Sequence, residues 1–176
     1  MKKIIYSFAL AVICSHAYGQ VAIGKISVEG ASTILDFNNI TTNTKGIILP
    51  SVENLSMALS STPFENNGTF LFDKSDSKIK MYENNAWIEL SGTGSNSQII
   101  TNTSQEAPNN LGVVIGSDAS NAKGILVLES TTKAMVLPKI ADPHTNVKSP
   151  YPGMMCYDTT THSLALFDGL KWNYWK

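Results

Sequence analysis

The chain has 176 residues, 13 of them Lys or Arg and 14 Asp or Glu, which gives a formal net charge of −1 at pH 7. Every basic residue is Lys, and this argues against nucleic acid as a partner, because Arg-bearing basic patches supply affinity and base reading there. The same balance argues against a polybasic membrane-surface patch. The length allows one or two domains.

Residues 1–19 have the pattern of a secretory signal peptide. Two lysines open the chain, residues 4–14 are apolar, and Ala17 and Gly19 are the small residues before a cleavage at Gln20. The apolar run is too short to span a bilayer, and no later run comes close. We therefore expect an exported mature chain, found in the medium or at the cell surface, with no transmembrane segment.

Each of the two cysteines has a favoured interpretation and an alternative. Cys14 leaves a lipid anchor open as the lesser reading, since Ile13 precedes it where a lipobox has a small residue. Only Cys156 remains after cleavage, so the mature chain has no intrachain disulfide. A buried, inert thiol is the favoured interpretation of Cys156, and a nucleophile paired with His162 is the alternative.

The first half of the mature chain predicts short strands followed by a helix. β-branched and apolar runs bounded by Gly, Asn and Ser predict strands at 21–23, 33–37 and 45–50. Pro50 ends the third of these, because proline cannot donate to a sheet. Ser51 is expected to cap a short helix that carries Val52, Leu55 and Leu59 and ends before Pro63.

Alternation of apolar and polar residues then predicts a three-stranded antiparallel meander. Residues 69–82 form a β-hairpin around the turn-rich loop 73–78, and Asn84-Asn85 turns the chain into a strand at 86–90. Residues 91–112 have the Ser, Gly and Asn content of a linker, interrupted by Ile99-Ile100.

The same pattern occurs a second time. Thr44 to Pro50 resembles Thr132 to Pro138, and a set of apolar, aromatic and turn residues recurs 85 positions later. Its members are Gly68 with Gly153, Phe72-Asp73 with Tyr157-Asp158, Met81-Tyr82 with Leu166-Phe167, and Trp87 with Trp172. The second copy predicts strands at 113–116, 125–128, 154–157, 164–167 and 171–175, with a turn of helix at Asp142-Pro143.

The repeat defines the expected fold class and domains. We expect a mainly β protein of two tandem modules, residues 20–90 and 113–176, joined by the linker at 91–112. Each module has short strands, a short helix and a C-terminal three-stranded antiparallel meander. The duplicated positions serve packing and turns and hold no acid–base pair or metal cluster, so we expect neither an enzyme nor a cofactor.

Several residues are candidate sites. Asp73 and Asp76 suggest a small calcium loop, against the favoured interpretation that an Asp hydrogen-bonds its own turn. Asp158-Thr159-Thr160 fits a short O-glycosylation pattern at Thr159. His144 and His162 are expected at the surface rather than as a metal pair.

The C-terminal aromatics are the candidate recognition site. Trp172 matches Trp87 and is expected to pack within its module, whereas Tyr174 and Trp175 replace Glu89 and Leu90. Trp172, Tyr174 and Trp175 are the possible contacts to a protein partner or a glycan.

The ordered set of motifs resembles a known family. In both copies Ile-Gly, a Thr-Lys strand ending in Pro, a Tyr/Phe-Asp pair, an aliphatic strand and a Trp follow one another, over residues 21–90 and 113–175. This set is similar to repeat modules of secreted Bacteroidetes surface proteins, and its hairpin half resembles phage tail-fibre and tail-spike segments. The resemblance implies an extracellular β-rich module, often in trimeric assemblies, and carries over no catalytic residue.

Two functions follow as expectations. The first is a secreted structural or adhesive surface protein of two fibre-like modules, acting through self-assembly, for which a trimer is one expected state, or through contacts with another surface protein. Short modules expose strand edges that oligomerisation would cover. The alternative is a carbohydrate-binding module that uses the C-terminal aromatics.

Overall fold

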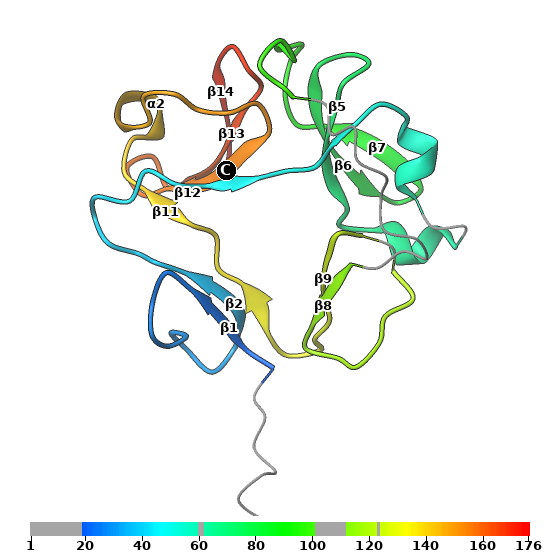
Figure 1. The fold of residues 1–176 in the computed structure, drawn as a ribbon, viewed down its shortest axis with the longest axis vertical. Helices are drawn as coiled ribbons and strands as arrows, with labels where there is room; N and C mark the ends of the chain where they lie inside the picture. The colour runs from blue at the N-terminus through cyan, green and yellow to red at the C-terminus, as the bar shows by residue number, and fades with distance from the viewer. Residues whose placement is uncertain (1–18, 60–61, 101–111, 123) are drawn as a thin grey trace, which may run out of the picture.

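The computed structural model describes residues 19–59, 62–100, 112–122 and 124–176 (Figure 1). The predicted signal peptide therefore lies outside the described residues. The described chain is mainly β, as expected, and its helical segments are single turns. These are η1 (Leu55–Ala58), η2 (Pro63–Asn66) and α2 (Pro143–Asn146). No helix in the described ranges has the length and apolar character to cross a membrane.

Each copy begins with a pair of short parallel strands. In the first copy β1 (Val21–Ile23) pairs with β2 (Thr33–Phe37), and in the second β8 (Val113–Ile115) pairs with β9 (Leu126–Leu128). The β-branched runs predicted these positions to within a residue, because such side chains fit an extended backbone.

Each copy ends with the predicted antiparallel meander. The first consists of β5 (Phe70–Asp73), β6 (Lys78–Glu83) and β7 (Ala86–Glu89). The second consists of β12 (Met154–Asp158), β13 (Ser163–Phe167) and β14 (Trp172–Trp175). Figure 1 shows the two meanders at one end of the molecule and the parallel pairs at the other.

The segment after Pro50 corrects one expectation. Ser51 does not cap a helix but lies with Val52 in β4 (Ser51–Val52), which runs parallel to β5. Phe72 N donates to Pro50 O and Lys74 N donates to Val52 O, both at 2.9 Å. Pairing with the edge of β5 therefore satisfies the carbonyl groups of Pro50 and Val52 without a helix. The helical turn starts later, at η1, where Asn54 accepts a bond from Ser56 N at 3.0 Å.

The second copy repeats this added strand. β11 (Lys139–Ile140) runs parallel to β12, as β4 does to β5. The predicted helical turn at Asp142-Pro143 is confirmed as α2.

The remaining two strands exchange partners between the copies. β3 (Ile47–Ile48) of the first copy pairs antiparallel with β12 of the second. β10 (Ala134–Met135) of the second copy pairs parallel with β2 of the first. Two sheets thus take strands from both copies, and the division into two modules stays a prediction.

The core is shared in the same way. One buried cluster combines residues of both copies: Leu49, Phe72, Ile79, Leu90, Met155 and Leu166. A second lies within the second copy: Ile140, Met154, Cys156, Ala165 and Phe167. Burial of each large apolar side chain contributes about 1.5–3 kcal/mol. A shared core lets two short copies bury more than either would alone.

Candidate functional site

The ends of the two meanders meet at the C-terminus. Trp175 Nε1 donates to Leu90 O at 2.6 Å, and Leu90 is the residue that Trp175 replaces in the second copy. The bond therefore joins the equivalent ends of β7 and β14. It fixes the indole ring, because its only N–H group is used.

An open depression of about 240 Å³ lies beside this contact. Residues from both copies form its lining: Glu89, Leu90, Ser91, Gly92, Asn173, Tyr174 and Trp175. Tyr174 and Trp175 are 42% and 45% exposed. Consecutive side chains of a strand point to opposite faces, so the indole of Trp175, bound to Leu90 O, faces the depression and the ring of Tyr174 faces the other side of β14.

The three predicted contact residues do not all lie at the depression. Tyr174 and Trp175 line it from β14, whereas Trp172 packs against Phe167 with ring centroids 5.4 Å apart. Its counterpart Trp87 packs edge-on against Tyr82 at 5.1 Å. The packing role expected for Trp172 and Trp87 agrees with these ring contacts.

The phenol of Tyr174 stays neutral near pH 7. Partial burial raises its pKa, and the nearby charges of Asp158 and Asp142 raise it further. A neutral phenol can both donate and accept a hydrogen bond, which suits a polar ligand.

The predicted linker contributes to this surface. Ser91 and Gly92 line the depression, and beyond them Gly94 N donates to Ser77 O while Ser95 N donates to Asp168 O, each at 2.8 Å. Residues 91–96 therefore bind the turns of both meanders. The sequence reasoning missed this role, although the two glycines among these residues are a signal of close backbone approach.

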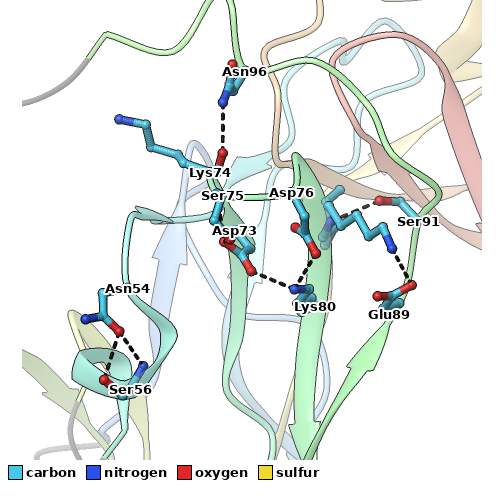
Figure 2. Close-up of polar contacts among 12 residues, drawn as sticks. Asn54, Ser56, Asp73, Lys74, Ser75, Asp76, Lys80, Glu89, Ser91 and Asn96 are labelled. Carbon is cyan, nitrogen blue, oxygen red and sulfur yellow. Dashed lines mark hydrogen bonds and ion pairs between the residues drawn. The ribbon is translucent and has the colours of Figure 1, made fainter.

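The acidic loop of the first meander is held by a lysine (Figure 2). Lys80 Nζ lies 2.6 Å from both Asp73 Oδ2 and Asp76 Oδ2. Ser75 donates its N–H and its hydroxyl to Asp73 Oδ1, at 2.9 and 2.6 Å. The Lys80 ammonium group therefore binds the carboxylate oxygens that a calcium ion would need as ligands. The bonds from Ser75 to Asp73 are those of an aspartate that caps its own turn.

The second copy caps its loop without a lysine. Asp158 accepts bonds from Thr160 N at 2.8 Å and Thr161 Oγ1 at 2.7 Å, and from Asp142 N at 3.0 Å. Ala165 stands where the first copy has Lys80. The loop shape is kept while its charge contacts change. No group of three or more His, Cys, Asp or Glu able to hold a metal occurs among the described residues.

Cys156, His144 and His162 do not line the depression. Burial raises the pKa of the Cys156 thiol to about 12, and the charge of Asp158 adds to the shift. His162 is exposed in the β12–β13 turn, and His144 is exposed with Nδ1 3.4 Å from Asp142 Oδ1. A thiol in this state is a poor nucleophile, which favours the inert interpretation.

Comparison with known protein families gives a match to part of the chain. Residues 114–176, which are the second copy without its first residue, match the family described as "Phage tail like trimerisation region". No curated protein and no solved structure matches the chain. The match agrees with the tail-fibre resemblance of the hairpin half, and the family description is that of a structural, self-associating region.

Proposed function

We propose that this protein is an exported structural chain that self-assembles, as a trimer, into a fibre-like element of the cell surface. One observation carries the assembly: the two copies within a chain bind each other by adding strands to one another's sheets, at β3–β12 and β10–β2. A module that joins its own duplicate this way has the chemistry to join further copies, because strand addition relies on main-chain groups and a few apolar contacts.

The match of residues 114–176 supports the trimer. The leader pattern supports export. The absence of repeated chemistry in the sequence supports a structural rather than an enzymatic role. A surface location and an origin in Bacteroidetes rest on the sequence resemblance.

Light scattering during size-exclusion chromatography of residues 20–176 tests the assembly. The expected result is a single species with three times the mass of one chain. A folded monomer at micromolar concentration contradicts the proposal. Protease treatment of intact cells, followed by immunoblotting, tests the location; protection from protease would place the chain elsewhere.

A second candidate function is glycan binding at the depression of Tyr174 and Trp175. It is favoured by the exposed ring of Trp175, which lines the depression with Glu89, Ser91 and Asn173, since sugars stack on aromatic faces and hydrogen-bond to polar groups. A partner protein on the same surface would use the same residues.

A glycan array decides between these uses. Trp175→Ala is expected to abolish a glycan signal, and Trp175→Phe is expected to keep most of it, because a ring remains while the bond to Leu90 O is lost. Leu170→Ala, at an exposed residue outside the depression, is the control. No signal for the parent chain, or equal signals for all variants, removes this candidate.

A further inference from the structure

Two equivalent strands differ sharply in exposure. β2 and β9 occupy the same place in the two copies, each parallel to its own first strand, and Leu35 corresponds to Leu126. Leu35 is 0% exposed and Leu126 is 45% exposed. The residues before them, Ile34 and Ile125, are 2% and 75% exposed. The same strand is thus covered in one copy and open in the other.

The open edge of β2 is covered by a strand of the other copy, while Ile34 lies against Gly116 of that copy. Met135 of β10 lies beside Leu35, and Val136 N donates to Leu35 O at 2.9 Å. β9 pairs only with β8 among the described residues. What β9 lacks is therefore a strand like β10.

The first copy holds such a strand, and its matching edge is open. Pro50 aligns with Pro138, so Ile48 of β3 corresponds to Val136. Leu49 N donates to Gly153 O at 3.0 Å, which places the N–H of Leu49 on the side of β12. Successive N–H groups point to opposite edges of a strand. The N–H of Ile48 therefore points away from β12, to the edge that its counterpart Val136 uses to bind β2.

We propose that the open edge of β9 binds β3 of a second copy of this chain, in the register that β10 adopts on β2. Ile47 of one chain lies beside Leu126 of the other, and Ile48 N donates to Leu126 O. This deepens the proposed function, on which it rests, by naming the strands that join the chains. Ile48, Ile125 and Leu126, now exposed, become covered.

The occupant is another chain because, within one chain, β3 belongs to the sheet of β12 and does not pair with the separate sheet of β8 and β9. The junction is head-to-tail, and such junctions close into rings when the rotation between chains allows. The edge of the first meander at Thr69 and Phe70, which is equivalent to the edge of β12 that β3 binds, does not accept β10 in the same way. The close contact of β3 with that edge is made by Gly46, where a Cβ would lie 2.6 Å from Met155 O. β10 has Ala134 in the equivalent place, so its Cβ would clash.

Crosslinking tests the junction directly. Cysteine is placed at Ile48 in one chain and at Leu126 in another, both in a Cys156→Ser background, and the mixture is treated with a short bismaleimide. A covalent dimer of the two chains is expected to form severalfold more than with Ile26→Cys in place of Ile48→Cys. Ile26 is more exposed than Ile48 and lies outside the strands of the described residues. Equal yields for the two pairs overturn the proposal.

Leu126→Pro gives an independent test. Val113 N donates to Ile125 O, so β8 bonds Ile125 and Val127, and the N–H of Leu126 faces the open edge. Proline there removes no bond to β8, but it removes the N–H of residue 126 from the open edge and places its ring where β3 would lie. The variant is expected to keep its circular dichroism spectrum and to lose most of its assembled form, whereas Leu126→Ala retains more of it.

The outcomes separate the two proposals. An assembled parent chain without the Ile48–Leu126 crosslink, or with an unaffected Leu126→Pro variant, overturns the β3–β9 junction and leaves the proposed function standing. A monomeric parent chain contradicts both. Failure of Leu126→Pro to fold shifts the decision to the crosslink, which does not require that variant.

Discussion

The hairpin loops end in a residue with strained backbone geometry. Ser77 and His162 are equivalent, and each closes its loop with a positive φ, of 57° and 54°. This left-handed conformation costs a residue with a side chain about 1–2 kcal/mol of conformational energy, whereas glycine adopts it freely. Both copies keep a non-glycine residue there, so the loop shape is set by the contacts around it, such as those of Asp73 and Asp158.

His162→Gly is therefore expected to stabilise the fold, by up to about 1 kcal/mol, since glycine relieves the strain but costs more chain entropy. Urea denaturation followed by tryptophan fluorescence measures the change. His162→Ala keeps the strain and is the matched control. A glycine variant no more stable than the alanine variant contradicts this reading.

Lys80 holds two carboxylates in a largely buried site (Figure 2). Lys80→Met leaves Asp73 buried without its counter-charge and is expected to cost about 3–5 kcal/mol. Lys78, which pairs with exposed Glu89 at 2.8 Å, is the matched control. Lys78→Met is expected to cost about 0–1 kcal/mol, because exposed pairs are screened by water. Similar losses for both variants would show that burial of the pair does not matter.

Three buried aspartates make the stability of the fold depend on pH in the acidic range. Burial raises the pKa of Asp36, Asp73 and Asp158, but hydrogen bonds outweigh it and hold each pKa below the ordinary 3.8. A lowered pKa adds stability above pH 3.8 that is lost as pH falls through the folded value. We expect the melting temperature to be steady from pH 7 to 5 and to fall below about pH 4. Asp73→Asn should flatten that fall, and an unchanged slope contradicts the assignment.

At the scale of elements, residues 91–96 join the two meanders through a contact that only glycine permits. A Cβ on Gly94 would lie 1.9 Å from Asp168 O, and one on Gly169 would lie 1.9 Å from Ser95 O. Gly169 also has a φ of 94°. The two backbones therefore touch directly, which ties the orientation of one meander to the other.

Gly94→Ala is expected to destabilise the chain by about 1–3 kcal/mol, the usual cost of overpacking, because backbone must move. Gly92→Ala is the control: its Cβ would meet only the flexible Lys171 side chain, at 3.8 Å. Differential scanning calorimetry of the two variants measures the difference. Equal melting temperatures would mean that the contact between 91–96 and the 168–169 turn does not hold the meanders.

Local patterns predicted the elements better than their partners. Alternation at Phe70, Phe72, Ile79 and Met81 predicted the first hairpin, because its strands pair with their sequence neighbours. The spacing after Ser51 predicted a helix that starts too early, at Ser51 instead of Leu55, since nothing local reveals that the edge of β5 lies alongside Ser51 and Val52. The exchange of β3 and β10 between copies was equally invisible, because it depends on contacts far apart in sequence.

The candidate site shows the same limit. Tyr174 and Trp175 were identified because they differ in kind from their counterparts in the first copy. Their setting was not, since Glu89, Ser91 and Gly92 reach the depression only when the ends of β7 and β14 meet. Where two repeats form a site together, the sequence can reveal candidate residues within each repeat. It does not reveal how the two repeats are placed against each other.

At the scale of the whole molecule, the two copies interlock rather than follow one another. They share a core and exchange strands, yet β9 keeps an apolar edge that its equivalent has covered. Exposed strand edges invite pairing with other chains. An assembly of chains covers this edge with the same contacts that already join the copies.

Native mass spectrometry of residues 20–176 over a dilution series tests the central claim most directly, because it counts the chains in each species. The account predicts a trimer that persists at low micromolar concentration and is lost in Leu126→Pro. A parent chain that is folded and monomeric throughout the series would contradict it.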